Sequence, residues 1–229
     1  MNPTILLEPI GKNTAPAIAA AAIQSLKEKD NSVLLVLSAD HVIQDVEAFH
    51  NTIDIASKQA QDGKLVTFGI VPTDANTGYG YIKYSRENIE GSYKVEEFVE
   101  KPDLETARSY LEQGNYLWNS GMFMFQEDVL IDELSEQSPN IVASVIDAVS
   151  NAEKDLDFIR LDKQAFDSSP SDSIDYALME KSDNVVVVPL DAQWNDVGSW
   201  SVLHDIGTKD TNGNVIKGDV IVQETSNTY

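Results

Sequence analysis

Two carboxylates in this sequence stand where a divalent cation could bind. Asp40 follows an apolar run that reads as a strand, Val33 to Leu37, and Asp196 follows another, Val185 to Pro189. Ligands collect at the carboxyl ends of strands in doubly wound sheets, and Mg2+ is often held there by one or two carboxylates plus phosphate oxygens. The pattern therefore predicts a magnesium site at Asp40 and Asp196. Alternatively, Asp40 caps a turn or helix and Asp196 is the Asx residue of a Trp-lined turn.

A second group of residues suits a phosphorylated sugar. Glu100 and Lys101 end an expected strand, and Pro102 restricts Lys101 to extended backbone, which aims both side chains from one loop. A lysine can hold a phosphate as a point charge, and a glutamate can accept from sugar hydroxyls. Gly80 and Asn119 each come just before an expected strand. Gly80 would let the backbone approach a sugar closely, and the Asn119 amide could form hydrogen bonds with the hydroxyls of that sugar. The alternatives are a solvated Glu–Lys pair and ordinary turn residues.

Composition limits the classes of ligand and chemistry. The 229 residues include 16 Lys and Arg against 38 Asp and Glu, for a formal charge of -22, and no Cys. Such acidity argues against nucleic-acid or anionic-membrane binding, and the lack of Cys excludes disulfides, zinc–thiolate sites and thiol nucleophiles. His41, His50 and His204 lack metal-ligand spacing and a companion nucleophile, so we expect them to be structural. With no membrane-spanning run and no signal-like opening, we expect a cytoplasmic protein.

Alternating strands and helices must position these residues, which is the pattern of an α/β fold. Three apolar runs, Val33–Leu37, Leu65–Ile70 and Val185–Val188, read as strands buried on both faces of a helix-covered parallel sheet. Further strands are expected at Tyr81–Tyr84 and Tyr93–Phe98, joined through Arg86 to Asn88, and at Gly121–Phe125. Helices are expected over Ala15–Lys29 capped by Asn13 or Thr14, Val46–Gln61 capped by Asp45, Leu104–Leu111 closed by Gly114, and Ile141–Val149.

Both ends of the chain read as cut. An α/β nucleotide-binding domain normally begins with a strand and a Gly-rich phosphate loop, yet the sequence contains neither G-x-G-x-x-G nor G-x-x-x-x-G-K-[ST]. At the other end, Asn214 to Gln223 has strand character and the chain stops soon after, at Tyr229. We therefore expect an internal piece of a longer protein, with residues 1–210 as one domain and residues 211–229 as the start of a C-terminal β segment.

An ordered set of motifs over nearly the whole chain resembles one enzyme family. The motifs are Leu7-Glu8-Pro9 with Asn13 to Ala17, Ser38 to His41, Thr77 to Ile82, Phe98 to Pro102, Trp118 to Phe123, Ser173 to Tyr176, and Trp194 to Trp200. Together they resemble the mannose-1-phosphate guanylyltransferases (GDP-mannose pyrophosphorylases) of the bacterial type often fused to a mannose-6-phosphate isomerase. The ordered set is far more specific than any one motif.

The resemblance implies a Rossmann-like nucleotidyltransferase fold of the nucleotide-diphospho-sugar transferase type, with a mixed sheet flanked by helices. It implies that Asp40 and Asp196 hold a catalytic Mg2+ and that Lys101 binds the sugar phosphate. The remaining substrate contacts would be Gly80, Glu100 and Asn119 around mannose, Glu8, Asn13, Thr14 and Ala15 beside guanine, and Asp175, whose role the motif does not specify. The family begins with a strand and an Arg-bearing Gly-rich loop that this chain lacks, so we expect the isolated chain to be impaired.

The implied partners are GTP and mannose 1-phosphate, with no nucleic acid and no membrane, and a homo-oligomer stays open. The sugar phosphate would attack the α-phosphorus in line and release pyrophosphate, which requires positioning and charge neutralisation but no protein nucleophile. Two alternatives remain: a nucleotide-sugar-dependent glycosyltransferase, which would share the sheet and the acidic metal site, and a non-catalytic module that binds sugar nucleotides.

Overall fold

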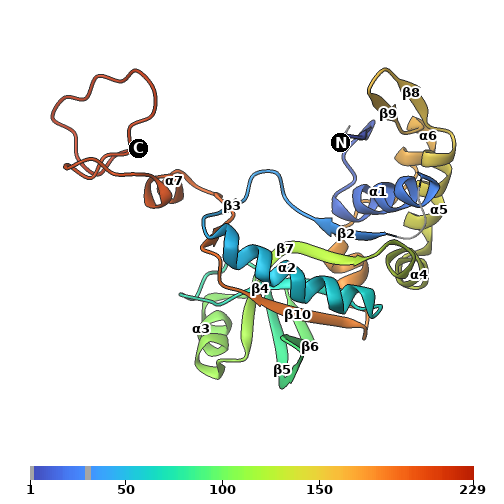
Figure 1. The fold of residues 1–229 in the computed structure, drawn as a ribbon, viewed down its shortest axis with the longest axis horizontal. Helices are drawn as coiled ribbons and strands as arrows, with labels where there is room; N and C mark the ends of the chain where they lie inside the picture. Colours follow the sequence, from blue (N-terminus) through green and yellow to red (C-terminus); the bar gives the residue numbers. More distant parts are fainter. Residues whose placement is uncertain (1–2, 29–31) are drawn as a thin grey trace.

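A mixed sheet of six strands forms the centre of the computed structural model, which describes residues 3–28 and 32–229 (Figure 1). Within the described strands of this sheet only β4 and β10 are parallel neighbours, and its other neighbouring strands pair antiparallel. The mixed sheet agrees with the fold class that the resemblance implies. In spatial order the strands are β2 (Val33–Val36), β7 (Tyr116–Gln126), β4 (Leu65–Ile70), β10 (Val185–Leu190), β6 (Ser92–Val99) and β5 (Tyr81–Ile89).

Helices cover both faces of this sheet because its strands alternate apolar side chains between two cores. Phe123 and Phe125 of β7 belong to a core with α1, α4 and α5, whereas Met122 and Met124 belong to a core with α2. Burying each such side chain contributes about 1.5–3 kcal/mol to stability. These helices are α1 (Thr14–Glu28), α2 (Val46–Gln61), α4 (Glu127–Gln137) and α5 (Pro139–Ser150).

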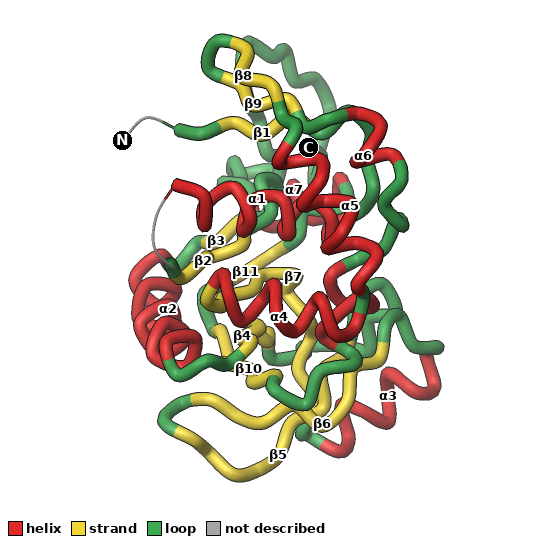
Figure 2. Tube along the Cα trace, turned by 90° about the vertical axis from the view of Figure 1, so that its right-hand side faces the viewer, coloured by secondary structure: helices red, strands yellow, loops and turns green. Residues whose placement is uncertain are grey.

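Smaller elements extend from this body. A three-stranded sheet of β1 (Ile5–Leu7), β9 (Phe158–Arg160) and β8 (Glu153–Asp155) stands on the side of α5 and of α6 (Lys163–Asp167) (Figure 1). The segment after α7 (Trp200–Ile206) stands away from the sheet on the opposite side. At the end of the molecule far from α1, β5 and β6 form a long hairpin with α3 (Leu104–Gln113) beside it (Figure 2). No helix in the described part of the chain is long and apolar enough to cross a bilayer.

Most helix predictions are confirmed. α2 spans the predicted residues, and the Asp45 carboxylate accepts the Ala48 N–H at 2.9 Å as its cap. α3 ends at Gly114, whose φ of 69° suits glycine. α1 begins at Thr14, where the Asn13 side chain accepts the Thr14 N–H at 2.8 Å. Its predicted last residue, Lys29, lies outside the described residues.

The prediction of a buried parallel strand over Val33–Leu37 is wrong in its last residue, its burial and the direction of its pairing. β2 ends at Val36, lies at the edge of the sheet, and pairs antiparallel with β7. Its residues are half-buried: Leu34 and Val36 pack toward the core of α1, and Leu35 packs toward the core of α2. A continuous apolar run indicates that both faces of a strand pack against helices. It does not indicate whether the neighbouring strand runs parallel or antiparallel.

Three other strand predictions need correction. β5 continues through Arg86 to Asn88, and the hairpin turns at Glu90 and Gly91, which have φ of 53° and 91° as a tight two-residue turn requires. β7 begins at Tyr116, so Asn119 lies inside a strand rather than before one. Residues 214–223 form no strand, and the described segment has only an isolated bridge between residues 209 and 215. Val215 is buried, but Ile216, Val220, Ile221 and Val222 stay exposed because no sheet edge meets them.

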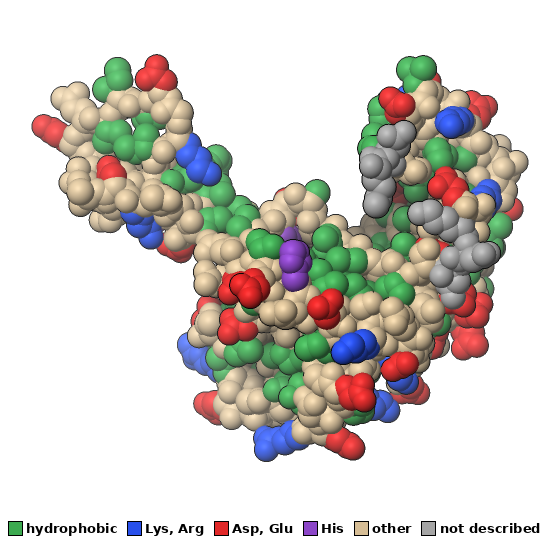
Figure 3. Space-filling model, in the orientation of Figure 1, with side chains coloured by type: hydrophobic (Ala, Val, Ile, Leu, Met, Phe, Trp, Pro, Cys, Tyr) green, Lys and Arg blue, Asp and Glu red, His purple; other side chains and the backbone are tan. Residues whose placement is uncertain are grey.

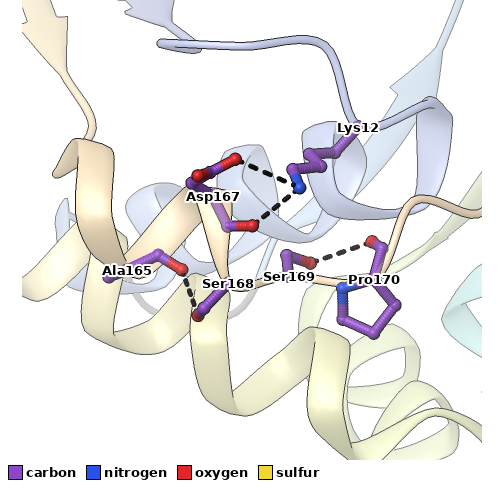
Figure 4. Close-up of polar contacts among 6 residues, drawn as sticks. All are labelled: Lys12, Ala165, Asp167, Ser168, Ser169 and Pro170. Carbon is purple, nitrogen blue, oxygen red and sulfur yellow. Dashed lines mark hydrogen bonds and ion pairs between the residues drawn. The ribbon is translucent and has the colours of Figure 1, made fainter.

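A half-buried lysine anchors the loop that leads into α1. Lys12 Nζ donates to the carbonyl oxygen of Asp167 at 2.7 Å and lies 3.4 Å from the Asp167 carboxylate (Figure 4). Two residues later the Thr14 hydroxyl accepts the Ile174 N–H at 2.9 Å. These contacts place the start of α1 beside Asp175, at one rim of the cavity described next.

Candidate active site

A cavity of about 470 Å³ opens where the strands of the main sheet end. The segments that follow β2 and β6 contribute to it, in agreement with the rule that ligands gather at the carboxyl ends of strands, and so do the interior of β7, the loop before β5 and the first turns of α1. Of the eleven residues predicted for the site, seven line this cavity: Thr14, Gly80, Glu100, Lys101, Asn119, Asp175 and Asp196.

One wall of the cavity is built from hydrogen-bonding groups. The Gly80 carbonyl accepts the Asn119 N–H at 2.8 Å, and Asn119 Nδ2 donates to Asp175 Oδ1 at 2.7 Å. The side-chain oxygen of Asn119 accepts from Gly121 N–H at 3.2 Å, which fixes the amide with one N–H still free to donate. A Cβ on Gly80 would stand 2.6 Å from Glu100 Oε2, so glycine is what lets this carboxylate lie against the backbone. Such a wall can form hydrogen bonds with several hydroxyl groups of one ligand.

Asp175 lies at the start of η1, a single π-helical turn (Asp175–Met179), and is largely buried. Burial raises the pKa of Asp175 above its ordinary value, while the hydrogen bond from Asn119 acts in the opposite direction. The nearby Glu100 carboxylate raises the pKa further. A largely buried acid with one oxygen held by an amide is a ready acceptor for a ligand hydroxyl.

Lys101 supplies positive charge at the rim. Its Nζ lies 3.1 Å from Glu100 Oε1, and its side chain is 63% exposed. The predicted extended backbone is wrong, because Lys101 has a φ of 45°. The ring of Pro102 disfavours the right-handed helical region for the residue before it but does not remove positive φ. Positive φ is uncommon for a lysine and costs backbone strain, and strain of this kind is often found at functional sites.

Asp196 is held from two sides. Its Oδ1 accepts the Tyr79 hydroxyl at 2.9 Å and the Gly198 N–H at 3.3 Å. Burial, followed by this hydrogen bond and the Asp196 charge, raises the pKa of Tyr79 to about 12, so the phenol remains the donor. Val197, the next residue, has a φ of 52°, a rare value for a β-branched side chain. The two hydrogen bonds to Asp196 and the unusual backbone conformation of Val197 therefore fix the position of this carboxylate.

Asp40 does not line the cavity, although its neighbours Ser38 and His41 do. It is exposed in the turn after β2. A short antiparallel ladder joins this turn to the loop of Asp196, with β3 (Val42–Ile43) paired to β11 (Trp194–Asn195). The ladder ends where Val42 pairs with Asn195, so Asp196 directly follows one of its strands and Asp40 comes two residues before the other. The two predicted metal ligands thus come from adjoining backbone segments.

Sequence reasoning missed His41, Tyr79 and Trp194, all of which line the cavity. The Trp194 indole N–H donates to His41 Nδ1 at 3.2 Å, so the neutral ring carries its proton on Nε2. The expectation that His41 is structural stays a prediction: its hydrogen bond to Trp194 agrees with it, and its side chain also lines the cavity. The available signal was its place next to Asp40 at a strand end.

Glu8 lies elsewhere. It follows β1 and lines a separate cavity of about 340 Å³ together with Arg160 and Lys163. Partial burial raises the pKa of the Glu8 carboxyl. Of the three residues predicted beside it, only Thr14 reaches the main cavity, because the Asn13 side chain caps α1 and Ala15 is fully buried.

Comparison with known proteins identifies similar sequences and structures. The family model described as nucleotidyl transferase matches residues 1–213. The mannose-1-phosphate guanylyltransferase of Salmonella montevideo is 55% identical over 231 residues, which cover 98% of this chain and 48% of that protein. The chain therefore spans about half the length of the curated relatives it matches.

Two solved structures are also similar. The crystal structure of mannose-1-phosphate geranyltransferase from Thermus thermophilus has a TM-score of 0.81 at 33% identity, covering 93% of this chain and 60% of that one. That of mannose-6-phosphate isomerase from Helicobacter pylori has a TM-score of 0.75 at 37% identity, covering 83% of this chain and 73% of that one.

Proposed function

The chain belongs to the nucleotidyl transferase family, and on that basis we propose that it transfers a guanylyl group from GTP to mannose 1-phosphate, giving GDP-mannose and pyrophosphate. The observation that carries the proposal is the wall of Gly80, Glu100 and Asn119, which offers partners for sugar hydroxyls directly beside the ammonium of Lys101. The name of the Salmonella relative supports the choice of mannose 1-phosphate and of the guanylyl group.

The charge of the cavity supports a role for Mg2+. Lys101 is the one Lys or Arg among the described residues lining it, against the carboxylates of Glu100, Asp175 and Asp196. Acidic side chains are also more widespread than basic ones on the face shown in Figure 3. A triphosphate needs further positive charge in such surroundings. The donor set suits Mg2+, which is usually bound by one or two carboxylates together with substrate phosphates and waters.

In the proposed reaction the residues of this chain position the reactants. Lys101 holds the phosphate of the sugar, while Asn119, Asp175 and Glu100 orient the ring through its hydroxyls. Asp40 and Asp196 would hold Mg2+, which when bound neutralises charge on the nucleotide phosphates. The sugar phosphate oxygen forms a bond to the α-phosphorus of GTP as the α–β bridging bond breaks and pyrophosphate leaves. Fixing both reactants in line supplies a large part of the rate enhancement.

Pyrophosphate release tests this function in the complete gene product that contains these residues. We expect pyrophosphate only when GTP and mannose 1-phosphate are supplied together. Transfer of mannose from GDP-mannose to an acceptor, without pyrophosphate, would instead identify a glycosyltransferase. Tight binding of GDP-mannose with neither reaction would identify a binding module.

Base selection by Glu8 gives a separate prediction. We propose that the Glu8 carboxylate accepts both N1–H and the N2 amine of guanine. The resemblance places the segment from Glu8 to Ala15 beside the base, and Glu8 lines a cavity of its own. A polar partner left unpaired penalises the wrong base more than an apolar pocket does. Glu8→Gln should therefore shrink the preference for GTP over ITP, which lacks the N2 amine, by about tenfold.

The comparison uses kcat/KM for GTP, ITP and ATP in the same assay, with Glu153→Gln as the matched control because Glu153 lines the same cavity. A GTP-to-ITP ratio that does not change in Glu8→Gln would remove Glu8 from base reading. Backbone groups of residues 13–15 would then be the next candidates.

A further inference from the structure

An aromatic cluster connects the two loops that carry the proposed metal ligands. The Tyr79 ring lies 5.0 Å from the ring of Trp118 and 5.7 Å from that of Trp194. Trp118 is 6% exposed on β7, so it provides a rigid support. Trp194 in turn donates to His41, next to Asp40. The cluster thus spans from the central sheet to both loops.

The Tyr79 hydroxyl is the one polar group of this cluster that meets a proposed ligand directly. It donates to Asp196 Oδ1 at 2.9 Å from a position held between two glycines, Gly78 and Gly80. The same Oδ1 accepts from Gly198 N–H, whereas no described residue donates a hydrogen bond to Oδ2. One oxygen of the carboxylate is therefore engaged by protein donors and the other is free.

We infer that Tyr79 is a positioning residue that fixes the Asp196 carboxylate so that its second oxygen can bind a divalent cation. The inference rests on the proposed function, which assigns Asp196 to the metal. Residues that hold a ligand by hydrogen bonds orient it and lower the entropy lost when the metal binds. The β3–β11 ladder anchors this loop only as far as Asn195. Asp196 needs further support because the strained backbone at Val197 follows it and the neighbouring hydrogen bonds are local, such as Val197 N–H to Asn195 Oδ1 at 2.7 Å.

The alternative is that Tyr79 only fills space between the two tryptophans. Replacing it with Phe separates these roles, because Phe keeps the ring and its packing and removes the hydroxyl alone. Packing alone predicts unchanged metal affinity. Positioning predicts weaker metal binding in a chain whose thermal stability changes little.

Mn2+ binding measured by electron paramagnetic resonance on the 229-residue chain tests the inference without any turnover. Asp196→Asn defines the binding that does not depend on this carboxylate, which matters in a chain with a formal charge of -22. We expect Tyr79→Phe to weaken the Asp196-dependent site by about 10- to 100-fold, the usual cost of losing such a supporting contact. Tyr84→Phe is the matched control, since the Tyr84 ring packs against Tyr93 at 5.1 Å on the β5–β6 hairpin.

Each outcome decides a different question. Unchanged Mn2+ affinity in Tyr79→Phe, with Asp196-dependent binding in the unmodified chain, would overturn the positioning role and leave the metal site standing. Equal binding by the unmodified chain and Asp196→Asn would overturn the metal site, and the positioning role with it. Equal losses in Tyr79→Phe and Tyr84→Phe would show a general effect of removing a hydroxyl and would also overturn the inference.

Discussion

Replacing Asp196 with Asn is expected to lower turnover by about 10²–10³-fold while the fold remains intact. Asn has nearly the same shape, and its Oδ1 can still accept from the Tyr79 hydroxyl and the Gly198 N–H. What it removes is the negative charge that the proposed Mg2+ requires. The variant therefore separates metal binding from the structure of the turn.

The measurement combines steady-state pyrophosphate release with thermal melts of the same preparations. Asp40→Asn should behave like Asp196→Asn if both carboxylates hold one cation. Asp191→Asn is the matched control, because Asp191 is an exposed carboxylate near the same strand end that lines a neighbouring cavity instead. A turn-capping role for Asp196 would give the reverse result, lower melting temperature with normal turnover per folded molecule.

Local sequence patterns were sufficient for the elements whose signals lie within a few residues. Asp45 and the apolar periodicity after it defined α2, and the continuous apolar run defined β4. At Asn119 the local pattern gave the wrong result, because this residue was expected before a strand and lies inside β7. It is polar because its amide bonds Asp175 and faces the cavity, and Gly121, with a φ of 70°, interrupts the regular alternation two residues later. The polar and glycine residues of this strand therefore gave it the local sequence pattern of a loop.

The sequence predicted which residues at strand ends lie near the candidate site, but it did not predict which side chains contact one another there. The strand-end rule located Asp196 and Lys101, which line one cavity, but it also selected Asp40, which does not line it. The pairing of Tyr79 with Asp196 joins residues 117 positions apart, and that of His41 with Trp194 joins residues 153 positions apart. No local periodicity encodes contacts at such separations, because they arise only when the sheet brings its loops together.

Lys101→Ala is expected to raise the KM for mannose 1-phosphate by about tenfold or more and to leave the KM for GTP nearly unchanged. A hydrogen bond between an ammonium and a phosphate contributes about 1.5–3 kcal/mol, and the exposure of the Lys101 side chain favours the lower part of that range. The substitution also leaves the Glu100 carboxylate without its ion-pair partner, so an incoming phosphate meets more negative charge. Lys101→Arg, which keeps the charge, should restore most of the affinity.

The value of this experiment lies in its selectivity between the two substrates. An exposed lysine that merely pairs with a neighbouring glutamate contributes about 0–1 kcal/mol and affects neither KM specifically. Lys83 is half-buried and lies 3.6 Å from Glu96 on the β5–β6 hairpin, away from the cavity, so Lys83→Ala is the control for loss of such an ion pair. Equal increases in both KM values for Lys101→Ala would indicate a general electrostatic effect on an acidic cavity. Only an increase confined to the sugar phosphate places the ammonium on that phosphate, and with it the sugar against the wall of Gly80, Glu100 and Asn119.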